Sequence, residues 1–434
     1  MKCGVHRSVL RFVLFLVQTA TLTLAAMSVS GQTDNAQIPK TPTTYAGMHI
    51  HRADQGTAWP TVGFGSWRLW DAYVAWPNLE PVRGKWDFAR LDRYVAMSRV
   101  TGVEILLPLG LSPRWASARP TEKSSYSPGN AAEPLDIEDW RNYVRTVATR
   151  YQGRIREYEI WNEVNEHGFY SGTPEKMVEL TCEAYKVLKS ISPQNRLVSP
   201  SMVGLGNAPE LLGNFLEKGG RNCVDVVGFH FYVPKGPPEA LLPLVARVRA
   251  AMKKAGVEHL PLWNTEAGWW IENDARKAST PDPQWLKRIS IDQAGAWVAR
   301  SLLLGRSAGL ERFYWYSWDN ADMGLMDPVS GKYRPGAVAF ATVAAWLSND
   351  ADADCAPSRS TWVCSVRRRT GNVEGVEEVV IWDTGPNGAS YQVPMGRRLL
   401  SVDFLYGRSR TAGAVAGLRS IDISEAPLRV TLGK

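Results

Sequence analysis

The chain alternates short apolar runs with longer segments in which apolar residues recur at helical spacing. Strands are predicted at eight of the short runs: 46–50, 66–70, 104–109, 157–161, 197–200, 224–231, 260–263 and 312–316. Amphipathic helices are predicted between them, for example over 135–151, 239–255 and 289–305. Another helix is expected to begin at Thr173-Pro174, where an N-cap residue precedes proline at the first helical position.

Strands that alternate with helices indicate a parallel sheet, because each crossover helix returns the chain to the same edge. Eight such strands in about 300 residues fit a closed (β/α)8 TIM barrel, which we expect over residues 45–348. An open, doubly wound sheet is the competing fold. The glycine-rich phosphate loop typical of that fold is missing from the sequence.

The pattern changes after about residue 350. Short strands are predicted at 361–366, 378–383, 391–394, 399–406 and 428–432, and the turns between them contain Gly385, Gly396, Gly407 and Gly413. No long helical period accompanies them. Residues 349–434 are therefore predicted to form a smaller antiparallel β-sandwich, with structural support favoured over carbohydrate binding as its role.

The N-terminus has the composition of a targeting segment. Lys2, Arg7 and Arg11 precede an apolar stretch over 12–26, and small residues follow up to Gly31. This pattern predicts a signal peptide over 1–31, cut near Gly31, followed by a Pro/Thr-rich linker over 32–44. A membrane anchor is the alternative, but the apolar run is too short to span a bilayer. The mature protein is expected to be exported, periplasmic or secreted, without stable membrane insertion.

Charge and cysteine content narrow the expected partners. The formal net charge is +7, and removing the three positive residues of the signal segment leaves +4 without any run of Lys or Arg, so no nucleic-acid partner is expected. Four cysteines remain after Cys3 leaves with the signal peptide, and they allow three pairings. Their spacing on a predicted hairpin favours Cys355 with Cys364, which leaves Cys182 with Cys223; four free thiols are the alternative.

Polar and aromatic side chains gather where the predicted strands end. They follow six of the eight strands: His49 and His51; Arg68 with Trp70-Asp71; Asn162-Glu163; His230 with Tyr232; Glu266; and Trp315-Tyr316-Ser317-Trp318-Asp319. The carboxyl ends of barrel strands meet at one face, where active sites of this fold lie. Glu163 and Glu266 are 103 residues apart, room for about three strand–helix units at roughly 30 residues each.

Two of these strand ends resemble a known group of enzymes. The stretch from Tyr158 to Asn165 resembles the acid/base strand of clan A of the glycoside hydrolases, and Thr265 to Gly268 is similar to its nucleophile strand. Within the clan, residues 45–434 most resemble glycoside hydrolase family 39. Val164 stands where the usual motif has proline.

The resemblance implies a retaining β-glycosidase that cleaves an oligo- or polysaccharide. Glu163 would be the general acid/base and Glu266 the nucleophile, with no metal or organic cofactor. β-Xylosidase and exopolysaccharide endo-hydrolase activities both remain open. A non-catalytic carbohydrate-binding barrel and an envelope scaffold are the rival hypotheses, and the presence of both carboxylates disfavours the first.

The clan also suggests roles for the neighbours of the two carboxylates. Asn162 would hydrogen-bond the sugar 2-hydroxyl, and Tyr232 and Arg68 would hold the nucleophile. His230 would line the site between the carboxylates, and Trp318 would form the apolar floor under the sugar.

Other polar residues are assigned with less support from the sequence. His49 is a candidate substrate-binding residue; its spacing from His51 could suit a metal, but no third ligand stands out. Glu159, Glu166 and Glu272 are expected to be solvated or helix-start carboxylates. Of the 18 tryptophans, five follow strands, and at least two of these are expected to stack on sugars: Trp59, Trp70, Trp115, Trp269 and Trp270.

Overall fold

A computed structural model describes residues 44–434 apart from 273–283, 349–350, 369–370 and 372. The predicted signal peptide and all but the last residue of the predicted linker lie outside this description. The predicted boundary between the two domains falls between residues 348 and 349, and residue 349 also lies outside the described residues.

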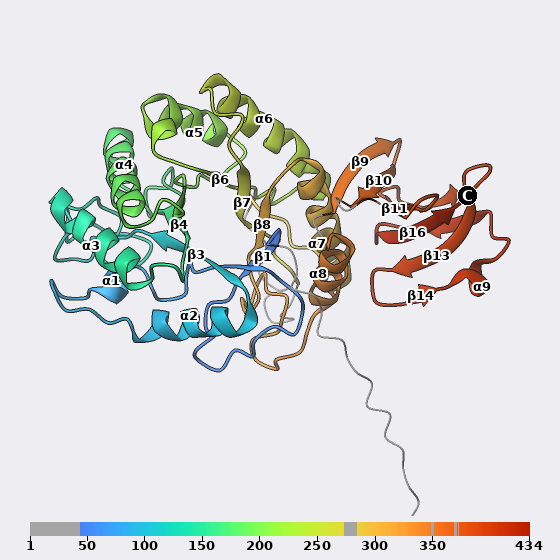
Figure 1. The fold of residues 1–434 in the computed structure, drawn as a ribbon, viewed down its shortest axis with the longest axis horizontal. Helices are drawn as coiled ribbons and strands as arrows, with labels where there is room; N and C mark the ends of the chain where they lie inside the picture. Colours follow the sequence, from blue (N-terminus) through green and yellow to red (C-terminus); the bar gives the residue numbers. More distant parts are fainter. Residues whose placement is uncertain (1–43, 273–283, 349–350, 369–370, 372) are drawn as a thin grey trace, which may run out of the picture. The chain divides into compact units, whose positions relative to one another are not determined.

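Eight parallel strands form one sheet in the order β5-β4-β3-β2-β1-β8-β7-β6 (Figure 1). They are β1 Ala46–His49, β2 Ser66–Arg68, β3 Glu104–Leu109, β4 Glu157–Ile160, β5 Arg196–Val198, β6 Val227–His230, β7 Leu262–Ala267 and β8 Arg312–Trp315. Parallel bridges from Val198 to Val226 and from Val203 to His230 join the two edges. The predicted (β/α)8 barrel is confirmed.

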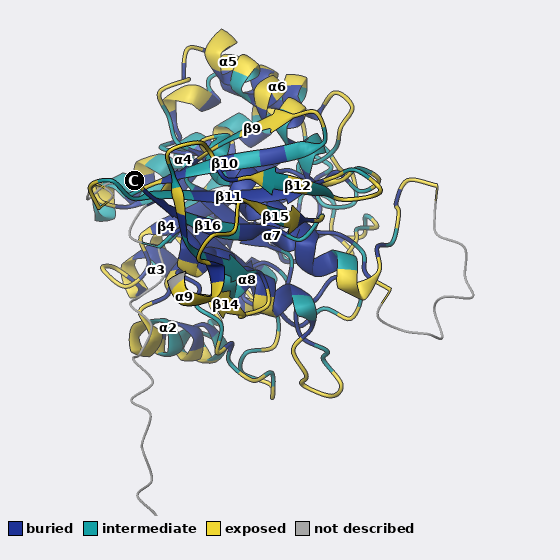
Figure 2. Ribbon diagram, turned by 90° about the vertical axis from the view of Figure 1, so that its right-hand side faces the viewer, coloured by how far each residue is buried: buried dark blue, intermediate teal, exposed yellow. Residues whose placement is uncertain are grey.

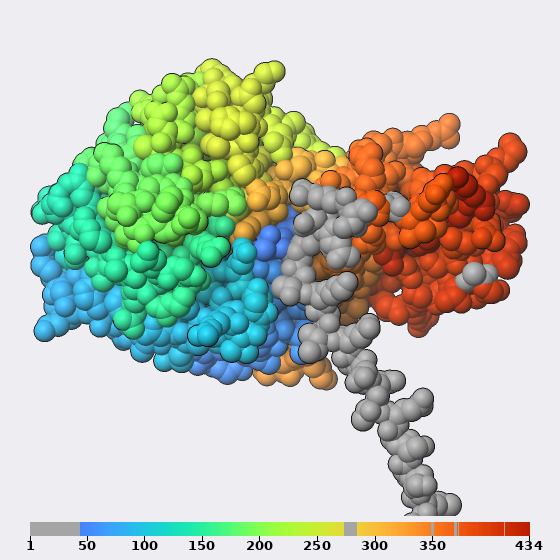
Figure 3. Space-filling model, viewed as in Figure 1, coloured from blue at the N-terminus to red at the C-terminus, as the bar shows by residue number. Residues whose placement is uncertain are grey.

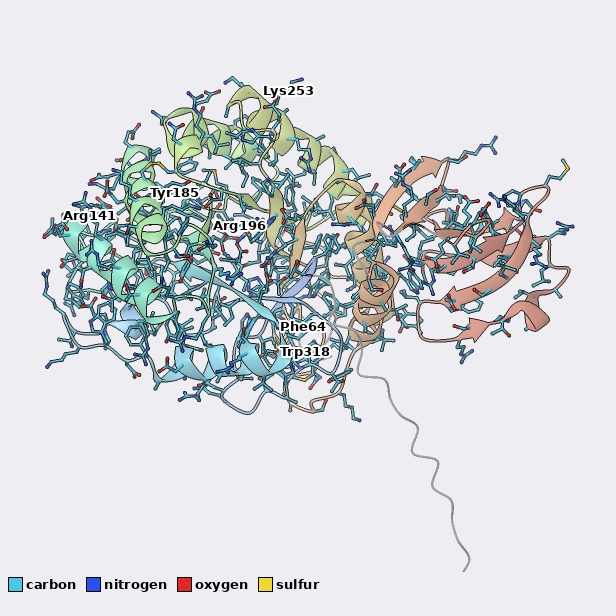
Figure 4. The ribbon with its side chains drawn as sticks, in the orientation of Figure 1. Phe64, Arg141, Tyr185, Arg196, Lys253 and Trp318 are labelled. Atoms are coloured by element: carbon cyan, nitrogen blue, oxygen red, sulfur yellow. A yellow bond between two sulfur atoms is a disulfide. The ribbon has the colours of Figure 1, made fainter. Side chains whose placement is uncertain are left out.

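The helices follow the strands in sequence order around the barrel (Figure 1), and the surface colours of Figure 3 run from blue through green to orange in the same order. They are α1 Trp76–Leu79, α2 Ala89–Thr101, α3 Ile137–Arg150, α4 Pro174–Ile191, α5 Ala208–Glu217, α6 Leu241–Lys254, α7 Ile291–Ser307 and α8 Pro335–Trp346. Thr173 caps α4 as predicted, because its side chain accepts a hydrogen bond from the Lys176 amide. Side chains fill the space between strands and helices (Figure 4).

Charged pairs are buried among the strands. On β4, Glu157 lies 3.4 Å from the Arg312 guanidinium, and Glu159 accepts a 2.5 Å hydrogen bond from Arg68. Two residues apart on one strand, these glutamates point to the same side of the sheet. The expectation that Glu159 is solvated is wrong: its side chain is fully buried, and an arginine on β2 compensates its charge.

The C-terminal strands form two antiparallel sheets. β14 Ser409–Arg410, β13 Arg398–Phe404, β16 Leu428–Gly433, β11 Glu377–Asp383, β10 Thr361–Arg367 and β9 Asp352–Ser358 pair in that order, and β12 Ala389–Gln392 pairs with β15 Ser420–Ile423. A short helix, α9 Ala412–Val415, lies beside β13. Apolar residues of both sheets, including Val379, Val430 and Ile423, share one core. The predicted β-sandwich is confirmed, although β9, β14 and β15 were not predicted.

Helix α7 connects the sandwich to the barrel. Arg300 on α7 pairs with Glu239, which also accepts a 3.0 Å hydrogen bond from the Trp382 indole of β11. Arg306, nearer the end of α7, pairs with Asp352 of β9 at 2.9 Å. Because both layers cover it, α7 is buried over most of its length (Figure 2).

Both favoured disulfides are present. Cys182 on α4 is bonded to Cys223, and Cys355 on β9 to Cys364 on β10. Bridges of this kind are typical of oxidising compartments. Among the described residues, no helix combines the length and apolar character needed to cross a bilayer.

Candidate active site

The structure brings Glu163 and Glu266 together. Glu163 lies three residues beyond β4, in a backbone with φ of 45°. Glu266 lies within β7, which extends further than the predicted 260–263. One oxygen of each carboxylate and a ring nitrogen of His230 all lie within 4.8 Å of one another. The 103 intervening residues fold into the units that carry the chain from β4 to β7.

Arg68 of β2 organises the floor of this site. Its fully buried guanidinium donates three hydrogen bonds: to Glu159 at 2.5 Å, to Glu266 at 2.9 Å and to Asn162 at 2.8 Å. The planar fork of an arginine can hold several acceptors at fixed angles. It therefore fixes the Glu266 carboxylate and the Asn162 amide relative to each other.

Two residues of strand β6 and the loop after it contact the carboxylates. The Tyr232 hydroxyl donates to Glu266 Oε1 at 2.9 Å. His230 Nδ1 lies 2.9 Å from Glu163 Oε1 and 4.0 Å from Glu266 Oε1. Burial lowers the pKa of His230 to about 4, so its ring is neutral near pH 7. A neutral imidazole can then share one hydrogen bond with Glu163.

Burial raises the pKa of both carboxylates, so their hydrogen-bond partners decide which of the two keeps a shared proton. Burial raises the pKa of Glu163 to about 7, with the Arg68 charge opposing it. Burial likewise raises the pKa of Glu266 to about 7, with the electrostatic effects of His230 and Arg68 opposing it. Only Glu266 accepts hydrogen bonds from both a guanidinium and a phenol. When the pair holds one proton, that proton therefore resides on Glu163.

His49 lies beneath the site. Its Nε2 is 3.1 Å from the Thr265 carbonyl oxygen, and the side chain is fully buried. Its ring lies 5.1 Å from the Tyr316 ring. Burial lowers the pKa of His49 well below its usual value, with the charge of Arg68 acting in the same direction. This geometry assigns His49 to holding β7 beside the nucleophile candidate.

Trp318 does not line the site. Its side chain is fully buried, packs against Tyr333 and donates to the Ala58 carbonyl oxygen at 3.2 Å. The chain leaves β8 after Trp315, so the alternation that would place Trp318 inward no longer applies. Tyr316, half-buried, is the aromatic residue that β8 delivers near the carboxylates.

Asp71, which the sequence analysis placed at a strand end without giving it a role, belongs to a polar cluster beside the carboxylates. Asp71 accepts hydrogen bonds from Tyr126 at 2.5 Å and from Tyr316 at 2.9 Å. Its charge raises the pKa of both Glu163 and Glu266, after the larger effects already described. The position of Asp71 after the second strand was a usable signal, whereas nothing in the sequence marked Tyr126.

The other glutamates and tryptophans named in the sequence analysis differ in their exposure and in their contacts. Glu166 and Glu272 are exposed, as expected. Trp70 lies over Arg68 with 5.9 Å between guanidinium and ring, and Trp270 lies 6.1 Å from the Tyr232 ring. Trp269, in contrast, is buried against Trp297 and Trp315.

Glu163, His230 and Glu266 could together offer three ligand atoms to a metal ion. The Arg68 guanidinium, however, already donates to Glu266 at 2.9 Å. A fixed positive charge at this distance opposes a cation in the same place. The arrangement suits a pair of carboxylates sharing a proton better than a metal centre.

Three comparisons place the chain among known proteins. A family model described as "Glycosyl hydrolases family 39" matches residues 67–292, which is more than half of the chain. A beta-xylosidase from Geobacillus stearothermophilus is 27% identical over 210 residues, a match that spans 42% of this chain and 40% of that protein.

Solved structures share the fold at lower identity. A family 39 glycoside hydrolase from Bacteroides cellulosilyticus WH2 superposes with a TM-score of 0.69 and 19% identity, over 91% of this chain and 81% of that one. A monomeric beta-xylosidase from Caulobacter crescentus CB15 superposes with a TM-score of 0.62 and 16% identity, over 91% and 97%. The chain belongs to the glycosyl hydrolases family 39.

Proposed function

We propose that the protein is a retaining glycoside hydrolase that cleaves β-linked glycans by double displacement. The observation that carries this proposal is the approach of Glu163 and Glu266 to within 4.8 Å, measured between carboxylate oxygens. Retaining enzymes hold their two carboxyl groups about 5–5.5 Å apart, whereas inverting enzymes leave about 6.5–9.5 Å for a water.

The roles follow from the hydrogen bonds of each carboxylate. Glu266, held ionised by Arg68 and Tyr232, attacks the anomeric carbon, and the bond to the leaving oxygen breaks. Glu163, protonated below about pH 7, gives its proton to that oxygen. A water then enters, Glu163 takes its proton, and the ester with Glu266 is hydrolysed.

Asn162 and His230 complete the site around the reacting sugar. Asn162 is positioned by Arg68 so that its amide NH2 group can donate to the sugar 2-hydroxyl. His230 orients Glu163 through their 2.9 Å contact. Tyr316 takes the place beneath the sugar that the sequence had suggested for Trp318.

Substitution of each carboxylate tests the assignment. Glu266→Gln abolishes turnover of every substrate, because no nucleophile remains. Glu163→Gln retains activity on aryl glycosides with good leaving groups, which need no proton, and loses it on unactivated glycosides. Glu258→Gln, an exposed glutamate between α6 and β7, is the matched control and retains parent activity. Parent-like kinetics in both active-site variants would contradict the roles proposed for Glu163 and Glu266.

The proposed substrate is a β-linked glycan, with β-xylosides as the first class to assay. This choice rests on the beta-xylosidases that the chain resembles. We further propose export after removal of residues 1–31, supported by the two disulfides. N-terminal sequencing of the exported protein tests the cleavage near Gly31.

A further inference from the structure

A cavity of about 800 Å³ lies beside the two carboxylates, over the C-terminal ends of β1, β2, β3 and β8. The residues of its lining used here are Trp70, Asp71, Tyr73, Arg114, Tyr126 and Tyr316. Glu163 and Glu266 are not part of that lining. The cavity therefore extends beyond the two carboxylates, and Tyr316, proposed to lie beneath the reacting sugar, belongs to its lining.

The cavity and the reaction centre share one wall. Asp71, with Tyr126 and Tyr316 bonded to its two oxygens, forms this wall on the cavity side. The charge of Glu266 acts on both tyrosines of this wall, because it contributes to raising the pKa of Tyr126 and of Tyr316. A sugar chain leaving the reaction centre on this side enters the cavity directly.

The position of Glu163 shows which side of the cleaved bond the cavity serves. Glu163 faces β5 and β6: its amide lies 3.4 Å from the Ser201 hydroxyl, and its carboxylate contacts His230. The acid protonates the leaving group, so the leaving group departs toward β5 and β6. The cavity lies over β1, β2, β3 and β8, and therefore holds the opposite, non-reducing side of the substrate.

The lining has the groups that bind sugars. Tyr73 is 56% exposed with the Arg90 guanidinium 5.0 Å from its ring, and Arg114 is exposed. No ion pair joins the Arg114 side chain to a carboxylate among the described residues. Asp71 and Tyr73 both adopt positive φ, near 56° and 58°. Such strain in non-glycine residues persists where the surroundings enforce it, and it clusters at binding sites.

Resting on the proposed function, we infer that this cavity binds at least one further sugar unit on the non-reducing side of the cleaved bond. Cavities of about 300–1,000 Å³ bury ligands of drug size, which exceeds one sugar ring. The enzyme would then release disaccharides or longer products from a chain, whereas a closed pocket would release single sugars.

Paired aryl glycosides test this inference. The probes are 4-nitrophenyl β-xyloside and β-xylobioside, with the β-glucoside and β-cellobioside as a second pair. We expect kcat/KM to be at least about tenfold higher for the disaccharide of the hydrolysed pair, the value of one or two added hydrogen bonds. An equal or lower kcat/KM for the disaccharide overturns the inference while leaving the proposed function standing. A protein that hydrolyses none of the four overturns both.

Variants locate the effect. Arg114→Ala is expected to lower the disaccharide-to-monosaccharide ratio of kcat/KM about fivefold to tenfold, by loss of one charged hydrogen-bond donor. Tyr73→Ala should lower it likewise. Arg99→Ala, an exposed arginine on α2 outside the cavity lining, is the matched control and keeps the parent ratio. A parent-like ratio in both cavity variants overturns the placement.

Discussion

Replacing Glu163 by glutamine should stabilise the protein at alkaline pH. Burial raises the pKa of Glu163 to about 7 in the folded protein, from an ordinary value of 4.5 for a solvated glutamate. Between these pH values the folded state binds more protons than the unfolded state, so stability is full below about pH 4.5 and falls as pH rises toward 7. Glutamine cannot ionise and removes this loss.

The magnitude follows from the size of the shift. One pKa unit corresponds to about 1.4 kcal/mol, so a shift from 4.5 to about 7 costs roughly 3 kcal/mol above pH 7. Removing the like charge also makes ionisation of Glu266 easier, which adds in the same direction. We expect the free energy of unfolding of Glu163→Gln to exceed that of the parent by about 1–3 kcal/mol at pH 8.5 and to equal it at pH 4.5.

Urea unfolding of the parent and Glu163→Gln at pH 4.5, 6.5 and 8.5 measures this difference. Glu258→Gln, exposed and located between α6 and β7, controls for a general effect of charge and should show no comparable pH-dependent gain. A Glu163→Gln advantage that is the same at all three pH values would refute the reasoning, because it would not come from ionisation of the buried carboxyl.

Three further outcomes follow from the same contacts. Arg68→Met should lower the free energy of unfolding by about 3–5 kcal/mol at pH 7, measured by urea denaturation, and kcat/KM by at least about 100-fold. Arg68→Lys should recover little of either loss, since one ammonium cannot hold three acceptors in the geometry of a guanidinium. The kcat/KM profile should be bell-shaped, because the active form of the pair holds one proton: the rate rises as the first carboxyl ionises and falls as the second does, and burial raises the pKa of both. A rate that stays flat through pH 9 argues against it. Replacing both Cys182 and Cys223 by serine should cost about 4 kcal/mol in urea unfolding, the value for a loop of this length, and an unchanged midpoint would contradict it.

The strand ends carried most of the predictive information. Asn162, Glu163 and Glu266 follow apolar runs, and the barrel places all strand ends at one face, so their meeting could be predicted without a structure. Arg68 could be placed at that face too. Its three hydrogen bonds could not, because they depend on the buried position of Glu159 on β4.

Loops and strand registers escaped prediction for physical reasons. Tyr126 lies in the long connection between β3 and α3, whose path is set by tertiary contacts such as its bond to Asp71. Trp318 was expected at the site from the resemblance to clan A of the glycoside hydrolases. β8 ends at Trp315, however, so Tyr316 lies by the carboxylates and Trp318 enters the core.

The central claim is that Glu266 forms a covalent bond to the sugar while Glu163 moves the proton. Incubation with an activated 2-deoxy-2-fluoro β-xyloside or β-glucoside, followed by peptide mass spectrometry, tests it most directly. The account predicts one added fluorosugar, on the peptide that contains Glu266, and products that keep the β-configuration. A label on any other residue, or products of inverted configuration, would contradict it.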